Sequence, residues 1–121
     1  EVYHFLRTFY EKVEFYLEKS EGNTVKYIGD SVFIAFPSES VSSSINYLKN
    51  MKNKIDKWLN TENEYSVCQL KVHVGKAAVG RISPRGSENI DIFGSVVNEL
   101  FMLPDGEFIL SEPVAKLEEI N

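Results

Sequence analysis

The sequence has 121 residues, of which 43% are hydrophobic, and this length suits one domain with a single core. Its longest uninterrupted apolar run, Val32–Phe36, is far shorter than the roughly 20 residues that a membrane-spanning helix needs. The formal net charge is −5, and no basic stripe of the kind that contacts nucleic-acid phosphates is visible. These features predict one folded domain with no membrane contact and no nucleic-acid partner. The lone Cys68 cannot form an internal disulfide, so we expect a cytoplasmic location.

The first third of the chain predicts a helix followed by a tight β-hairpin. Apolar residues recur at helical spacing over Val2–Leu17. Two strand-like runs, Thr24–Ile28 and Ser31–Phe36, follow and are separated only by Gly29 and Asp30. A two-residue connection that begins with glycine is typical of a type II′ hairpin turn, so we expect Gly29 and Asp30 at its tip.

The rest of the chain predicts three more helices and four further strands. Ser38 or Ser40 suits the cap of a second helix, whose apolar face runs from Val41 to Leu59. The remaining elements are expected in this order: a strand over Val67–Val74, an arm-like hairpin from Ala77–Ile82 and Ile90–Phe93 joined by Ser83–Asn89, a helix over Val96–Leu103, a strand over Phe108–Leu110, and a last helix opened by Ser111.

This order of elements predicts an α+β fold. In chain order it is α-β-β-α-β-β-β-α-β-α, which suits a mostly antiparallel sheet with helices packed on one face. The sequence begins inside a predicted helix and ends inside another, so we expect it to be part of a longer domain.

The hairpin Val25–Ser31 carries the most informative polar residues. A carboxylate at its tip, on Asp30, would be exposed and able to bind a hard cation through oxygen. Lys26, on the strand that leads to the tip, suits the recognition of an acceptor on a base or a phosphate. The structural alternative is more common for this spacing alone, since Asp is frequent in turns and an alternating Lys usually lies on the solvated face of a strand.

A series of short motifs gives these residues a context. They are K-x-I-G-D at residues 26–30, H-x-G at 73–75, G-R-I-S at 80–83 in place of G-x-I-G, D-x-x-G at 91–94, and V-N at 97–98. Each motif is weak alone, but their order and spacing resemble those of class III nucleotidyl (adenylate/guanylate) cyclase domains from end to end of the chain. The resemblance implies a cyclase-like, ferredoxin- or palm-like α+β fold. It also implies one cyclase-homology domain over residues 1–121 that lacks the first strand and the C-terminal hairpin of the family.

The resemblance also implies a role for individual residues. Asp30 matches one of the two metal-binding aspartates of the family. Lys26 matches the position that reads the base, where Lys implies adenine, and Asp91 matches its partner, which accepts from the adenine amino group. Asn98 matches the asparagine that orients the ribose. The implied ligand is therefore ATP rather than GTP, with two Mg²⁺ or Mn²⁺ ions as cofactors, bound between the subunits of a homodimer or beside a paired cyclase domain.

Two departures from the family concern catalysis. The family reaction converts ATP into cyclic AMP and pyrophosphate, as a phosphorus–oxygen lyase, and uses an arginine to stabilise the transition state. Met102 stands at the position of that arginine, and the following segment, Leu103–Glu107, is shorter than in the family. The other metal-binding aspartate and the phosphate-binding lysine belong to elements outside this sequence. We therefore expect little or no cyclic AMP from a homodimer.

Three interpretations follow from these observations. The first is an adenylate cyclase that is weakly active or depends on a partner subunit for its arginine. The second is a non-catalytic cyclase-homology module for dimerisation or nucleotide sensing, which Met102 slightly favours. The third, an unrelated α+β binding domain, is disfavoured by the ordered motifs. His73 lacks a partner at metal-ligand spacing, which predicts a packing or hydrogen-bonding role at a strand end. Cys68 is expected to be a small core residue.

Overall fold

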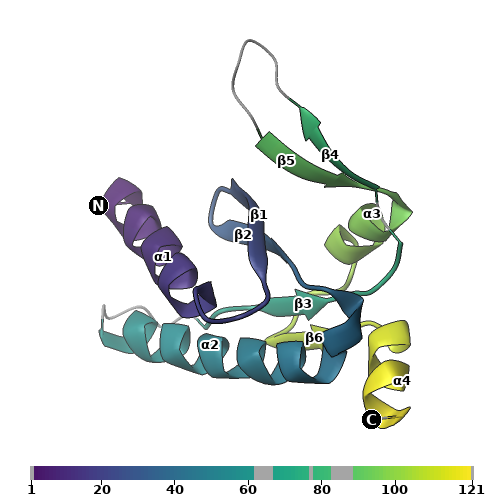
Figure 1. Ribbon diagram of the computed structural model, residues 1–121. Helices are drawn as coiled ribbons and strands as arrows, with labels where there is room; N and C mark the ends of the chain where they lie inside the picture. The colour runs from purple at the N-terminus through teal and green to yellow at the C-terminus, as the bar shows by residue number, and fades with distance from the viewer. Residues whose placement is uncertain (1, 62–66, 77, 83–88, 121) are drawn as a thin grey trace.

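The computed structural model describes residues 2–61, 67–76, 78–82 and 89–120 of the chain. Helices and strands follow one another in the predicted order, and the fold class is α+β, as predicted (Figure 1). The elements are α1 Val2–Leu17, β1 Asn23–Ile28, β2 Ser31–Ala35, a short 3₁₀ turn η1 Ser38–Ser40, α2 Val41–Thr61, β3 Leu70–Val72, β4 Ala78–Ile82, β5 Asn89–Phe93, α3 Ser95–Phe101, β6 Phe108–Leu110 and α4 Glu112–Ile120.

The strands pair in three separate two-stranded sheets within the described residues, rather than in the single sheet that we expected. β1 and β2 form an antiparallel hairpin, and its register shifts between Thr24 and Lys26. β4 and β5 form a second antiparallel pair, the predicted arm, which extends away from α2 (Figure 1). β3 pairs with β6 in parallel, because the two strands are joined through the arm and α3 rather than through a tight turn.

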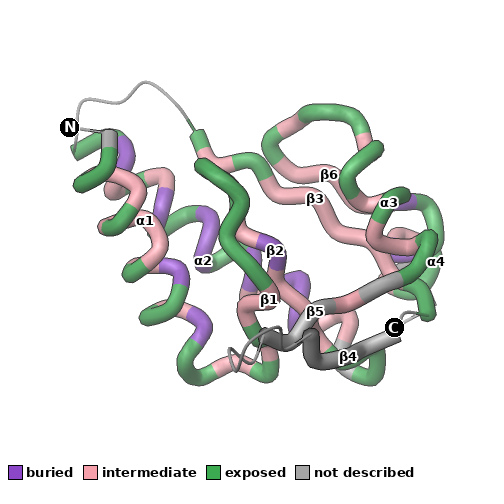
Figure 2. Tube along the Cα trace, turned by 90° about the horizontal axis from the view of Figure 1, so that it is seen from above, coloured by how far each residue is buried: buried purple, intermediate pink, exposed green. Residues whose placement is uncertain are grey.

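The core lies between α1, α2 and the inner face of β2. Helical spacing brings the apolar side chains of α1 and α2 to facing sides, and Phe5 stacks on Trp58 with ring centroids 5.1 Å apart. The buried cluster consists of Val13, Leu17, Leu48, Met51, Ile55 and Leu59. Figure 2 shows the buried residues concentrated on these helices and on β2, whereas β1 is largely exposed.

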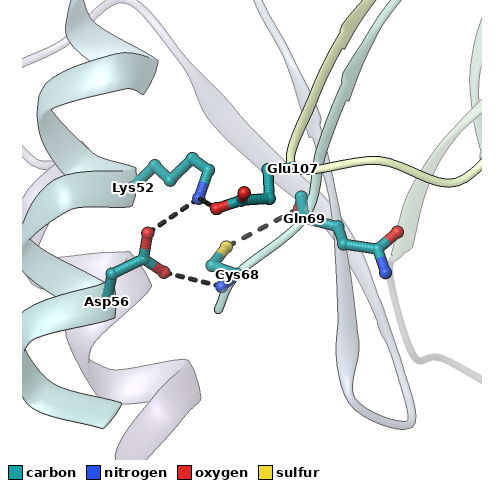
Figure 3. A network of polar contacts seen from close by, with 5 residues as sticks. All are labelled: Lys52, Asp56, Cys68, Gln69 and Glu107. Atoms are coloured by element: carbon teal, nitrogen blue, oxygen red, sulfur yellow. Dashed lines mark hydrogen bonds and ion pairs between the residues drawn. The ribbon is translucent and has the colours of Figure 1, made fainter. Parts of the chain in front are cut away.

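A buried ion pair fastens α2 to the parallel strands. Lys52 is only 8% exposed, and its Nζ lies 2.7 Å from Asp56 Oδ2 and 3.7 Å from Glu107 Oε1 (Figure 3). Asp56 also accepts a hydrogen bond of 2.6 Å from the backbone N–H of Cys68. A buried lysine requires such partners, because an unpaired charge in the interior costs several kcal/mol. The network therefore fixes the entries to β3 and β6 against α2.

Several predicted bounds differ from those observed. β3 spans three residues, Leu70–Val72, rather than Val67–Val74, because its partner β6 is equally short. α3 ends at Phe101, two residues before the predicted end. The predicted loop of the arm lies mostly outside the described residues. In the part of the chain that the structure describes, none of the helices has the length and apolar character needed to cross a membrane.

Candidate functional site

Asp30 lies at the tip of the β1–β2 hairpin, as the sequence predicts. Gly29 precedes it with a φ of +55°, which glycine adopts without the steric cost that other residues pay. Ile28 pairs with Ser31, so the turn consists of Gly29 and Asp30 alone. Asp30 is exposed, and no described residue donates a hydrogen bond to its carboxylate or forms an ion pair with it. The tip thus presents a hard oxygen donor to solvent.

Two tyrosines connect this tip to α1. The hydroxyl of Tyr10 donates to the carbonyl oxygen of Gly29, and the hydroxyl of Tyr27 donates to the carboxylate of Glu14. The two rings lie against each other, with centroids 4.2 Å apart. Partial burial and the hydrogen bond to Glu14, whose negative charge also disfavours tyrosinate, raise the pKa of Tyr27 to about 12. The tip is therefore attached to the helix by side chains from both elements.

The two residues expected to read the base lie on neighbouring strands. Lys26 is exposed on β1, three residues before the turn. Asp91 lies on β5, where it pairs with Gly80 of β4. β1 contacts β5, although the two strands belong to different sheets. The fold therefore brings together the strands that carry Lys26 and Asp91.

The residues expected to contact the ribose and the transition state lie on α3. Asn98 is exposed in the middle of this helix, and Met102 caps its C-terminus with its N–H 3.1 Å from the carbonyl oxygen of Asn98. Met102 is 83% exposed, and α3 contains no arginine. The α3 surface thus presents an amide and, one turn later, an apolar thioether where the family pattern has a cation.

α3 is held in place by contacts with β2 and with the segment after β3. Phe101 packs edge-on against Phe33 of β2, with ring centroids 5.7 Å apart. Gly75 lies so close to α3 that a Cβ atom there would come within 2.7 Å of the Val96 side chain. The glycine of the H-x-G motif is therefore required by packing against this helix, since any larger residue would push it away.

His73 adds a polar link to the same helix, so of the two roles predicted for it, packing or hydrogen bonding, the hydrogen bonds are observed. Its Nε2 lies 2.7 Å from Glu99 Oε2 of α3, and its Nδ1 lies 2.8 Å from Oγ of Ser111, which precedes α4. A carboxylate only accepts, so Nε2 carries a proton and donates to Glu99. The His73 side chain is 8% exposed and Ser111 is buried, so the link is shielded from water on the Ser111 side.

A cavity of about 1460 Å³ lies between the hairpin and the rest of the molecule. β2 lines one side and β3 the other, with apolar residues of α1 and α2 between them, and Asp30 is among the lining residues. In the described part of the chain, β2 pairs only with β1 and β3 only with β6, so each strand has an unpaired edge. The cavity is therefore bounded by two sheet edges that can still accept a strand.

The chemistry of Asp30 fits one ligand position of a divalent cation, because Mg²⁺ and Mn²⁺ prefer carboxylate oxygen. Residues 2–61, 67–76, 78–82 and 89–120 contain no group of three His, Cys, Asp or Glu side chains that could hold a metal ion. Asp30 therefore supplies a single ligand, and a complete site needs further donors.

The contribution of Tyr10 and Glu14 is not among the features predicted from the sequence. A sequence signal for them exists: the two residues are four apart on a predicted helix and so share one face, which is polar at these positions. Their partners, Gly29 and Tyr27, are 19 and 13 residues away, and the sequence gives no indication of that pairing.

Comparison with known proteins identifies the fold. No family model and no curated protein matches the chain by sequence. Among solved structures, the chain is similar to a crystal structure of the guanylyl cyclase Cya2, with a TM-score of 0.79 and 12% sequence identity. The similarity covers 97% of this chain and 66% of that one, so the chain spans about two thirds of the length of its neighbour. The chain therefore has a cyclase-like fold.

Proposed function

We propose that this chain is a cyclase-homology domain that binds a nucleoside triphosphate with divalent cations, prefers ATP, and has little or no cyclase activity as a homodimer. The observation that carries the proposal is the carboxylate of Asp30, exposed at a hairpin tip and without a partner among the described residues. A turn aspartate with a purely structural role usually bonds to nearby backbone N–H groups. Among the residues that the structure describes, none forms such a bond with Asp30, which favours a ligand over a structural role.

The proposed metal requirement follows from the chemistry of this carboxylate. When bound, the ions would neutralise the triphosphate and lower the pKa of the attacking ribose hydroxyl. Asp30 would hold one side of that site, and the nucleotide phosphates and the other aspartate implied by the family resemblance would supply further oxygen ligands.

The preference for ATP rests on Lys26 and Asp91. A lysine donates only, and a carboxylate accepts, so the pair suits N1 and the exocyclic amino group of adenine. Asn98 would contact the ribose. The structural neighbour is a guanylyl cyclase, so GTP is the competing ligand in every binding experiment.

The low activity rests on Met102. A thioether carries no positive charge and is only a weak acceptor, so it cannot stabilise the charge that develops on the α-phosphate. Removal of one such contact costs about 100- to 1000-fold in rate in other enzymes. The exposure of Met102 favours a second candidate function, a non-catalytic module that dimerises or senses nucleotide.

The cavity between β2 and β3 has the features expected of a place where a further strand pairs. Within the described residues, β2 and β3 each have an unpaired edge, and both strands line the cavity. Its walls are mainly apolar side chains of α1, α2 and the strands. We propose that a strand from outside this sequence pairs there and joins the separate sheets. On the family resemblance, this strand would carry the first of the two metal-binding aspartates, Asp30 being the second.

Isothermal titration of the full-length protein with Mn²⁺–ATP tests the proposal. We expect Asp30→Ala to weaken binding by about tenfold or more, the usual consequence of losing a charge-assisted contact. Asp105→Ala is the matched control, because it removes an equally charged carboxylate that is 85% exposed and pairs with Lys71 instead. Equal affinity of the unmodified protein and Asp30→Ala would contradict the proposed role.

A further inference from the structure

The tip of the β1–β2 hairpin has no buried side chain of its own. Every residue from Lys26 to Ser31 is exposed, and a two-stranded hairpin is marginally stable without packing or further strands. The buried residue of the hairpin, Phe33, lies further from the turn, on β2. The orientation of Asp30 must therefore be determined by contacts other than core packing.

Those contacts come from one face of α1. Tyr10 and Glu14 are one helical turn apart, and each forms a hydrogen bond with the hairpin: Tyr10 with the carbonyl of Gly29, and Glu14 with the hydroxyl of Tyr27. The Tyr10 and Tyr27 rings pack on each other between these two bonds. The same helix is anchored in the core through Val13 and Leu17. The tip is thus connected to a helix anchored in the core by a hydroxyl, a carboxylate and two rings in contact.

The hydrogen bond from the Tyr10 hydroxyl is made to the residue that directly precedes Asp30. The carbonyl of Gly29 belongs to the peptide group that joins Gly29 to Asp30, and this group is planar. A hydrogen bond that fixes the carbonyl also fixes the N–H of Asp30 and limits the rotation of the residue that follows. Glycine itself does not limit that rotation, because it lacks a Cβ atom and here adopts a positive φ.

We propose that Tyr10 is a positioning residue for Asp30, and that its hydroxyl orients the carboxylate for a cation-bound nucleotide by holding the Gly29 carbonyl. This inference rests on the proposed role of Asp30. Tyr27 and Glu14 support the contact by keeping the hairpin against α1, at the distance where the Tyr10 hydroxyl reaches the turn.

Tyr10→Phe in the full-length protein tests this role, because it removes the hydroxyl and keeps the ring contact with Tyr27. Tyr47→Phe is the matched control: the Tyr47 hydroxyl donates to the carbonyl of Tyr16, so it ties α2 to α1 far from the turn. We expect Tyr10→Phe to weaken Mn²⁺–ATP binding by about threefold to tenfold, the effect of one hydrogen bond. Tyr47→Phe should leave this affinity unchanged.

The double variant Tyr10→Phe, Asp30→Ala separates positioning from general stability. If Tyr10 acts through Asp30, its substitution has no further effect on affinity once the carboxylate is gone. The unfolding temperatures of Tyr10→Phe and Tyr47→Phe should fall by similar small amounts. A difference in affinity between the two variants would then not be caused by a difference in stability.

The possible results are distinct. Unchanged affinity in Tyr10→Phe, together with a loss in Asp30→Ala, would overturn the positioning role and leave the proposed function intact. An equal loss in Tyr10→Phe and Tyr47→Phe would also overturn it. Unchanged affinity in Asp30→Ala would overturn both the proposed function and this inference.

Discussion

α2 and α3 show how differently two helices of one small domain are stabilised. α2 spans 21 residues and buries seven of them, including Ile45, Ile55 and the paired Lys52. α3 spans seven residues and buries none, and it is held by single contacts to Phe33, Gly75 and His73. The hairpin tip resembles α3 in this respect, since its residues are exposed as well.

The residues that stabilise the fold are therefore different from those assigned to the proposed function. All four described candidate side chains, on Lys26, Asp30, Asn98 and Met102, are exposed, whereas the buried cluster contains none of them. Substitutions on the α3 and tip surfaces should therefore change ligand binding with little effect on folding. Substitutions on the inner face of α2 should do the opposite.

The largest expected effect is on the α2 side. Ile55 is 1% exposed, and Ile55→Ala should lower the free energy of unfolding by about 2–5 kcal/mol, since it removes buried methyl groups and leaves a cavity. Met102→Ala on α3 is the control and should change stability by about 0.5 kcal/mol or less. Urea denaturation followed by circular dichroism measures both. Similar losses for the two variants would contradict the comparison of α2 with α3.

The second largest expected effect is on cyclic AMP production and concerns Met102, at the C-terminal end of α3. The unmodified homodimer should make little or no cyclic AMP with saturating Mn²⁺ and ATP. Met102→Arg should raise the rate, by up to about 100-fold if the guanidinium reaches the α-phosphate. A cyclic AMP assay of the purified full-length protein, with Met102→Lys as a charge control, measures this change. Robust production by the unmodified homodimer would show that the methionine does not limit catalysis.

A smaller effect is expected from the base-reading position on β1. Lys26→Glu reverses the charge and replaces a donor with an acceptor, so it should reduce the preference for ATP over GTP by about tenfold. Competition of the two nucleotides in the Mn²⁺ titration measures the ratio. Lys49→Glu on α2, which makes the same change of charge, should leave the ratio unchanged. Tighter binding of GTP by the unmodified protein would exclude the adenine assignment.

The smallest expected effect is a change in the pKa of Tyr27, which is measured by titration at alkaline pH. Its pKa is about 12 in the fold, above the value of about 10 of an unfolded tyrosine, so the fold favours the neutral phenol. The contribution of this pKa difference to the free energy of unfolding is fully present below a pH of about 10. It is lost as the pH rises toward about 12. Glu14→Gln removes the negative charge beside the hydroxyl and should lower the pKa of Tyr27 part of the way toward 10. Tyrosinate absorbance during a pH titration, with Tyr27→Phe to assign the signal, measures it. An unchanged titration curve would show that Glu14 does not contact Tyr27 in solution.

Local patterns in the sequence predicted the elements well. The stripe over Val2–Leu17 matches α1 at both ends, and the two-residue connection at Gly29 and Asp30 matches the observed turn. These predictions succeed because helix periodicity and turn geometry depend on residues only a few positions apart. The predicted exposure of Asp30 follows from the same local reasoning.

The tertiary structure decided what lies beside these elements. The partners of His73, on Glu99 and Ser111, are 26 and 38 residues away, and the sequence only indicated that some hydrogen bond would exist. The pairing of β3 with β6 likewise joins segments that are far apart in the sequence. β3 is therefore as short as β6, three residues instead of the predicted Val67–Val74.

The sequence by itself therefore determined the order of the helices and strands, the turn that carries Asp30, and the absence of arginine at position 102. Only the tertiary structure decided that the strands form three pairs and that α1 reaches the turn through Tyr10. The physical reason is the range of the interactions. Backbone propensity and periodicity act within a few residues, whereas sheet pairing and side-chain contacts between elements depend on how the whole chain closes around its core.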